Sequence, residues 1–279
     1  MFKDIMVAIT RFQGDEAALA VGMQLAERDD AHLAVVIPVE FPVPVPNEWG
    51  VYPYQMYSAF YDDALKNANS LADELREKLG KQGIKFEVRV ESTVLMTGAQ
   101  TSAMHARYSD LVIVGAGAPD QKNYPLENNF IELLMNSGRP VLRVPHSSET
   151  DFTFDRIVIA WQPCREATRA VHDAMPFLKQ AKSIDILIID PKVGEAAHGE
   201  QPGADIAAHL ARHDLNVRVV TQPAMGKTTG EAIVEYGKQT DAQLIVAGGY
   251  SHSRFREFML GGVTRELSQH SQVPILFAH

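Results

Sequence analysis

Short runs of Val, Ile and Leu recur along the chain and alternate with segments that have helical spacing. Each run is continuously apolar rather than alternately apolar and polar, which is typical of strands buried on both faces of a parallel sheet. The runs predict ten strands, at residues 4–10, 31–38, 84–91, 110–115, 140–144, 156–161, 184–189, 215–221, 243–248 and 273–278.

The segments between the runs carry apolar residues on one helical face. Ala18, Val21 and Leu25 recur at helical spacing in the first half, and a similar series in the second half is Ala167, Val171, Ala174 and Leu178. Alternating short strands and helices predict an α/β fold with right-handed crossovers and a doubly wound parallel sheet.

The order of these elements is repeated within the chain. Three pairs of segments match in order and type: FKDIMVAIT (2–10) with FDRIVIAWQ (154–162), DLVIVGAG (110–117) with AQLIVAGG (242–249), and SGRPVLRVP (137–145) with SQVPILFAH (271–279). A length of 279 residues also favours two domains. We expect domains at 1–146 and 152–279, each with a five-stranded sheet, joined by a polar linker.

The first half carries an additional segment at residues 41–57. We expect a loop that leads into a helix around residues 59–79, because four prolines forbid regular helix: Pro42, Pro44, Pro46 and Pro53. The segment also holds the aromatic residues Trp49, Tyr52, Tyr54 and Tyr57. Long loops of this kind either pack on their own domain, which we favour, or form a ligand lid or partner surface.

Composition and charge exclude several classes of function. The chain has 46% apolar and 22% charged residues, and 26 Lys and Arg against 35 Asp and Glu give a net charge of −9. This acidic balance argues against nucleic-acid or anionic-membrane partners. Cys164 is the single cysteine, so an internal disulfide and a cysteine-built zinc site are excluded. We expect a cytoplasmic protein, because no secretory signal or membrane-length apolar run is visible.

The most informative segment is GGYSHSRFREFMLGGVTREL, residues 248–267. It joins a predicted strand to a predicted helix, the place where parallel sheets bind ligands. Gly248 and the pair Gly261-Gly262 allow close backbone approach, and the polar residues between them suit a phosphate chain: Ser251, His252, Ser253 and Arg254. The same residues also suit a structural role, in which the serines cap the helix and the glycines permit tight packing.

The repeat, this Gly-rich segment and the closing VPILFAH resemble the universal stress protein family in its tandem form, over essentially the whole chain. The family's nucleotide-binding members carry G-x2-G-x9-G-[S/T]. The matching positions here are Gly248, Ser251, Gly261 and Gly262. Ser251 therefore replaces the second glycine, Gly262 replaces the hydroxyl residue, and Thr264 follows two positions later.

The resemblance implies further contacts in the second half. An acidic residue that contacts the nucleotide corresponds to Gln162, which follows Ala160 at the end of the first strand of this half, and the apolar residue beside the adenine corresponds to Ile188. One ATP per chain, with Mg²⁺, is thus expected at Ala160, Gln162, Ile188, Gly248, Ser251, His252, Ser253, Arg254, Gly261, Gly262, Val263 and Thr264.

The first half departs further from the family pattern. Residues 115–140 hold no glycine followed by Ser or Thr at the required distance after Gly115, and Thr10 stands at the acidic position. We therefore expect the first domain to have lost the site and to act as a structural partner.

Three other sequence patterns resemble functional motifs, but the residues around them favour structural roles. MGKTTGEA (225–232) has Thr221 where a P-loop needs glycine, so Thr228 or Thr229 is expected to cap a helix. His209 and His213 have the spacing of two metal ligands but no third ligand, which favours a solvated helix face. Cys164 is interpreted as a small turn residue, since His172 lies eight residues away.

The resemblance also implies that the two domains pack about a pseudo-twofold axis. Their last strands, PVLRV (140–144) and PILFA (274–278), are apolar edge strands, and pairing them removes an exposed edge. The chain would then be an intramolecular dimer, with a further homodimer of chains left open.

Three functions are compatible with these residues. The first is a stress-response protein that binds ATP or a related nucleotide in its second domain as a regulatory ligand. The second is a protein-interaction module without nucleotide, favoured by the substitutions at positions 162, 251 and 262. The third is a slow nucleotide hydrolase, for which Asp190 is the nearest candidate acid.

Overall fold

The structure is a computed structural model of the chain. It describes residues 1–10, 15–41, 54–117, 124–146, 152–191, 194, 200–250 and 262–279. The predicted loop at 41–57 and the linker at 146–153 lie largely outside the described residues, as do Trp49 and Tyr52. The helix that follows this loop begins at Tyr54 rather than near residue 59, so the end of the predicted loop is helical.

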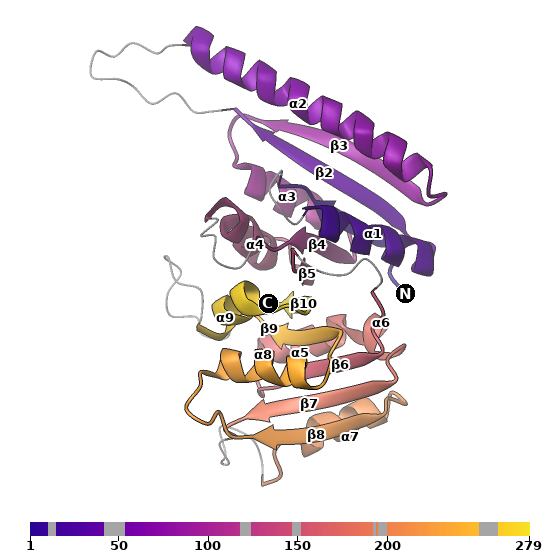
Figure 1. Cartoon of the computed structure of the whole chain (residues 1–279), viewed down its shortest axis with the longest axis vertical. Helices are drawn as coiled ribbons and strands as arrows, with labels where there is room; N and C mark the ends of the chain where they lie inside the picture. Colours follow the sequence, from indigo (N-terminus) through magenta and orange to yellow (C-terminus); the bar gives the residue numbers. More distant parts are fainter. Residues whose placement is uncertain are drawn as a thin grey trace, which may run out of the picture.

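All ten predicted strands are present and form one continuous sheet (Figure 1). Their order across the sheet is β3-β2-β1-β4-β5-β10-β9-β6-β7-β8, and every neighbouring pair is parallel except β5 and β10. The strands are β1 (Asp4–Ala8), β2 (His32–Glu40), β3 (Lys85–Thr93), β4 (Leu111–Gly115), β5 (Val141–Val144), β6 (Arg156–Ala160), β7 (Ser183–Ile189), β8 (Val217–Gln222), β9 (Leu244–Gly248) and β10 (Ile275–Ala278).

Helices cover both faces of this sheet. The core on one face includes residues of α1 (Asp15–Asp29), α2 (Tyr54–Gly80), α5 (Arg165–Asp173), α6 (Met175–Leu178) and α7 (Ala204–Ala211). The core on the other face includes residues of α3 (Gly98–Ala106), α4 (Tyr124–Asn136), α8 (Thr229–Gln239) and α9 (Gly262–His270). In the part of the chain that is described, no helix has the length and apolarity that a membrane crossing requires.

The repeat is visible in matching hydrogen bonds at the amino ends of the central strands. The Asp110 carboxylate accepts from the backbone N–H of Lys3 at 2.7 Å. The Gln243 amide oxygen accepts from the N–H of Asp155 at 2.8 Å in the second half. Both side chains stand directly before the fourth strand of their half, so each ties that strand to the start of the first strand.

Matching capping boxes begin the helix before the fourth strand of each half. The Thr97 side chain accepts from the N–H of Gln100 before α3, and Thr228 accepts from the N–H of Glu231 before α8. The prediction that Thr228 or Thr229 caps a helix is therefore confirmed at Thr228. The neighbouring Lys227 side chain binds Glu235, so the GKT sequence here belongs to a helix start rather than a phosphate loop.

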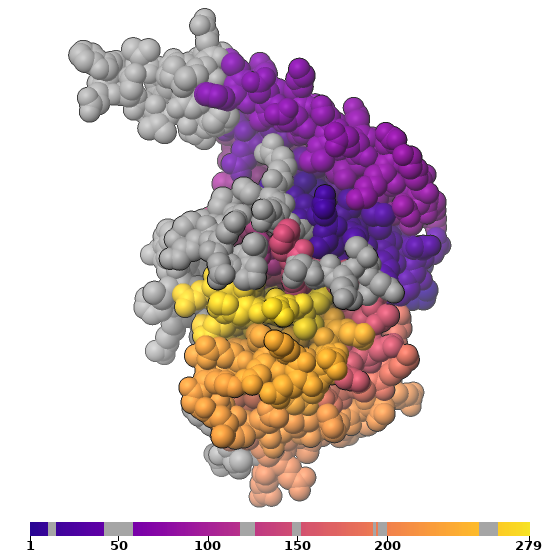
Figure 2. All heavy atoms as spheres, in the orientation of Figure 1, coloured from indigo at the N-terminus to yellow at the C-terminus, as the bar shows by residue number. Residues whose placement is uncertain are grey.

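The two halves join through their last strands, as expected. β5 and β10 are antiparallel, and Leu142 pairs with Leu276, its counterpart in the repeat, which places the pseudo-twofold axis at this pair. Phe130 of α4 packs on Phe277 with ring centroids 5.2 Å apart. The C-terminal segment, yellow in the space-filling view, lies where the second half meets the first (Figure 2).

On the opposite face of the sheet, three aromatic rings pack together at the junction between the halves. The Phe177 ring lies 5.1 Å from Phe2 and 4.8 Å from Phe154. The Gln24 amide adds two hydrogen bonds to the backbone of Phe152. Sheet and helical layers thus run without interruption from one half into the other.

We predict that Phe277→Ala destabilises the whole chain. The Phe277 side chain is fully buried at the junction, and truncation of a buried phenylalanine costs about 3–5 kcal/mol. Urea denaturation followed by circular dichroism measures the loss. Phe60→Ala is the matched control, since Phe60 is 60% exposed and should change the free energy of unfolding little. Equal effects of the two substitutions would contradict the assigned junction.

Candidate functional site

The carboxyl ends of β6 and β9 form the point at which the sheet of the second half changes winding direction. β6 pairs with β9 on one side and with β7 on the other. The helix after β6, α5, packs on one face of the sheet, and the helix after β9, α9, packs on the other. Doubly wound sheets bind ligands in the crevice between the amino ends of two such helices, and in this chain that place lies between α5 and α9.

Gly248 sets how closely α5 approaches this crevice. A Cβ atom added at Gly248 would lie 2.6 Å from the backbone nitrogen of Ala167 and 2.8 Å from the carbonyl carbon of Glu166. These are backbone atoms that cannot move aside, so the close contact of α5 with the end of β9 requires glycine. The packing role of this motif position is therefore established by geometry.

Cys164 occupies the N-cap position of α5, next to this contact. Its backbone N–H donates to the carbonyl oxygen of Gln162 at 2.7 Å. Burial, opposed by nearby backbone N–H groups, raises the pKa of the Cys164 thiol. A raised pKa disfavours the reactive thiolate, which agrees with the interpretation of Cys164 as a turn residue.

The structure brings two of the three predicted strand-end residues to the crevice. Ala160 is half-buried at the end of β6, and Gln162 is exposed directly after it. Ile188 is almost fully buried, and a Cβ atom added at Gly203 would lie 2.8 Å from its Cδ1 atom. The Ile188 side chain therefore packs under the start of α7.

Five of the predicted phosphate contacts lie outside the described residues: Ser251, His252, Ser253, Arg254 and Gly261. The residues on either side of this segment, which we call the loop roots, are described: Tyr250 after β9, and Gly262 to Thr264 at the start of α9. The backbone N–H of Tyr250 donates to the Thr264 hydroxyl oxygen at 3.2 Å. This hydrogen bond ties the two loop roots together.

The three predicted residues at the start of α9 face different surroundings. A Cβ atom added at Gly262 would meet no described atom within 4 Å, and Val263 is partly exposed. Thr264 is 4% exposed and engaged with Tyr250. Gly262 and Val263 are thus accessible, whereas Thr264 is directed into the protein.

A buried polar cluster under the loop roots was not predicted from the sequence. Arg143 of β5 donates from Nη2 to the Glu127 carboxylate of α4, and its Cζ atom lies 4.6 Å from the Phe130 ring centroid. Burial lowers the pKa of Arg143, and Glu127 opposes this change. Burial together with the Glu127 charge raises the pKa of Tyr250, so the phenol stays neutral. The one sequence signal is an arginine within the otherwise apolar PVLRV.

Comparison with known proteins identifies the second half. Residues 153–279 match the model of the universal stress protein family. The second half of this chain is a universal stress protein domain. Among curated proteins, no relative matches the chain.

The fold of the whole chain is similar to that of solved universal stress proteins. One from Archaeoglobus fulgidus DSM 4304 has 16% identity and a TM-score of 0.76, over 99% of this chain and 95% of that one. A universal stress protein described as putative, from Pseudomonas aeruginosa UCBPP-PA14, has 15% identity and a TM-score of 0.63, over 99% and 93%. A protein of unknown function from Pseudomonas aeruginosa PAO1 has 17% identity and a TM-score of 0.61, over 99% and 92%.

The corresponding strand end of the first half holds an internal carboxylate. Thr10, the counterpart of Gln162, donates from its backbone N–H and its hydroxyl to the Asp15 carboxylate, at 3.0 and 2.8 Å. In the universal stress protein domain the counterpart of Asp15 is Ala167, and the carboxylate of the adjacent Glu166 lies 3.4 Å from the Arg165 side chain. A negative charge at this point of the first half disfavours a phosphate there.

The remaining candidate residues of the second half are Asp190 and the pair His209 and His213. Asp190 is exposed, and its carboxylate accepts from the N–H of Ala224 at 3.1 Å. The rings of His209 and His213 lie 4.9 Å apart on α7. Among the described residues, no three His, Cys, Asp or Glu side chains converge to form a metal site.

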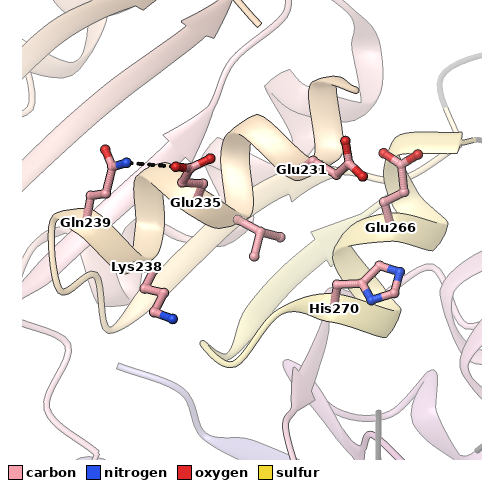
Figure 3. Close-up of a pocket in the computed structure, with 7 residues that line it drawn as sticks. Glu231, Glu235, Lys238, Gln239, Glu266 and His270 are labelled. Atoms are coloured by element: carbon pink, nitrogen blue, oxygen red, sulfur yellow. Dashed lines mark hydrogen bonds between the residues drawn. The ribbon is translucent and has the colours of Figure 1, made fainter. Parts of the chain in front are cut away.

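An open groove of about 650 Å³ lies between α8 and α9 of the universal stress protein domain (Figure 3). Its described lining is mostly charged or polar: Glu231, Val234, Glu235, Lys238, Gln239, Glu266 and His270. Three carboxylates against one lysine give this groove a negative rim, which repels phosphate groups. The groove is therefore a poor nucleotide site, in contrast to the crevice between α5 and α9.

We predict opposite stability effects for alanine at two motif glycines. Gly248→Ala should destabilise the protein by about 1–3 kcal/mol, because its Cβ atom overlaps the α5 backbone. Gly262→Ala should leave the free energy of unfolding unchanged or raise it by up to about 1 kcal/mol, because its Cβ atom enters open space in a helix. Thermal unfolding of the two variants checks both. A neutral Gly248→Ala would contradict the close packing of α5.

Proposed function

We propose that this protein binds ATP or a related nucleotide in its second domain as a regulatory ligand, one per chain. The domains are residues 1–146 and 152–279. The observation that carries the proposal is the change of winding direction between β6 and β9, with close packing at Gly248 and open space among the described residues at Gly262. The corresponding strand end of the first half is taken up by Asp15.

The residues at this crevice fit an anionic ligand. The amino end of α9 lies at Gly262 and Val263 and carries the positive end of the helix dipole, and the first N–H groups of a helix have no partner within the helix itself. The exposed amide of Gln162 offers both a donor and an acceptor to a ribose or base. By resemblance to the family, Ser251 to Arg254 and Gly261 add phosphate contacts. Mg²⁺ would arrive with ATP.

The same residues argue for binding without rapid turnover. Hydrolysis needs a group that orients water and a carboxylate placed for the metal. The candidate acid Asp190 already accepts a hydrogen bond from the backbone of Ala224, and the Glu166 carboxylate at the start of α5 is paired with Arg165. A cytoplasmic stress protein that changes shape or partners on binding is therefore our preferred function, ahead of a slow hydrolase.

Exposed apolar residues in the first half favour a second candidate function, a protein-interaction module. Val94 and Leu95 follow β3 and are 61% and 96% exposed. Exposed apolar side chains at the end of a sheet are suited to a protein partner. This candidate predicts binding of a protein without nucleotide.

The test of the main proposal is native mass spectrometry of the purified protein, followed by calorimetric titration of ATP with and without Mg²⁺. Gly262→Ser should bind ATP about fivefold more tightly, because it restores the family's hydroxyl and one hydrogen bond contributes about 1 kcal/mol. Gly262→Leu should lose ATP binding, because its side chain fills the open space at the start of α9.

Thermal unfolding supplies the control for this pair, since neither substitution touches described atoms at Cβ and both variants should remain folded. A protein that gives no heat up to millimolar ATP and carries no nucleotide as purified would overturn the proposal. Equal affinity in the wild type and both variants would show that the nucleotide binds elsewhere.

A further inference from the structure

The ion pair of Arg143 and Glu127 lies among buried apolar residues, where packing alone does not require charged side chains. Arg143 extends from β5 over the buried Phe130 ring, and its counterpart in the repeat is Phe277. The Arg143 side chain is 4% exposed, and its Nε and Nη1 atoms have no hydrogen-bond partner among the described residues. Apolar residues in place of such a buried pair are often neutral or stabilising. Stability alone therefore does not account for the pair.

The pair lies close to Tyr250 and contacts α9, the helix that begins at the second loop root. The Ser268 hydroxyl of α9 lies 3.4 Å from the second oxygen of the Glu127 carboxylate. The Tyr250 hydroxyl is buried, has no hydrogen-bond partner in the part of the chain that is described, and lies in the electrostatic field of Glu127 and Arg143. Charges of the first half thus act on Tyr250 and on the helix that follows the second loop root.

Two further features fix the position of Tyr250 beside the first half. A Cβ atom added at the preceding Gly249 would lie 2.7 Å from the Cδ2 atom of Leu134 in α4, so the backbone before Tyr250 packs directly on the first half. Tyr250 has a φ of +60°, which is unfavourable for a non-glycine residue and persists only when its surroundings hold it. Its N–H bond to Thr264 is one of these constraints.

We propose that the buried pair Arg143–Glu127 of the first half positions the loop roots of the second half, so that the first domain completes the nucleotide site without binding a nucleotide itself. This inference rests on the proposed function. Arg143 and Glu127 are positioning residues, which act through Tyr250 and Ser268. Holding the loop roots in place reduces the ordering that ligand binding must supply, and preorganisation of this kind raises affinity.

The test is the double variant Arg143→Met/Glu127→Leu, which removes both charges and keeps the volume. Calorimetric titration should give a dissociation constant for ATP at least about fivefold weaker than that of the wild type. The midpoint of thermal unfolding should be unchanged or higher. If the pair had only a structural role, its removal would lower the midpoint of thermal unfolding and leave the affinity for ATP unchanged. Titration and thermal unfolding together therefore separate the two roles.

The chain offers a matched control in a second arginine–carboxylate pair. Arg218 of β8 makes two hydrogen bonds with Asp185 of β7, at 2.9 and 2.7 Å, toward the outer edge of the sheet. The double variant Arg218→Met/Asp185→Leu should bind ATP like the wild type. Ser268→Ala, which removes only the contact with Glu127, should weaken ATP binding even if the first double variant fails to fold.

The outcomes distinguish this inference from the proposed function. A wild type that binds no ATP overturns both. A wild type that binds ATP, with equal affinity in Arg143→Met/Glu127→Leu and in Ser268→Ala, overturns the positioning role alone. An equal loss of ATP affinity in the control Arg218→Met/Asp185→Leu would also overturn the positioning role. The loss would then follow from removing any arginine–carboxylate pair of the fold.

Discussion

The antiparallel pairing of β5 with β10 is the constraint on which the rest of the structure depends. These four-residue strands are the ends of two parallel sheets, and each would otherwise present an open edge of apolar residues. Because Leu142 meets Leu276 at the axis, the helices before the two strands, α4 and α9, come together on one face. The same register brings Phe2, Phe154 and Phe177 together on the other face. A short ladder thus fixes every contact between the halves.

Within this symmetric frame the two halves differ at a few side chains. At the end of the first strand, Thr10 binds the Asp15 carboxylate in the first half, where the second half has Gln162 and Ala167. In the last strand, the first half has Arg143 where the second half has the buried Phe277. In both places the first half carries a charged side chain that makes internal contacts, and the backbone topology of the two halves is the same.

The sequence was sufficient for the fold because its signals are local. Continuous apolar runs located all ten strands, and the matching segments indicated the twofold arrangement and the pairing of the last strands. Gly248 was recognised as a position of close approach, but the atoms it approaches, the backbone of Glu166 and Ala167, emerge only from the packing of α5. Ile188 and Thr264 are predicted site residues, and the burial of their side chains emerges only from the packing. The prolines of 41–57 did not reveal that helix begins at Tyr54, because regular structure resumes directly after Pro53.

The Arg143–Glu127 cluster escaped prediction for a different physical reason. Its members lie on β5, on α4, after β9 and on α9, and Glu127 is more than one hundred residues from both Tyr250 and Ser268 along the chain. No periodicity or spacing connects such residues, and only the register of β5 with β10 places them together. A charge that is costly to bury, in a strand whose counterpart is apolar, is retained where it serves something other than packing. In this chain the groups next to the pair are Tyr250 and Ser268 of the second half, so the junction brings charges of the first half close to the place where we propose that the nucleotide binds.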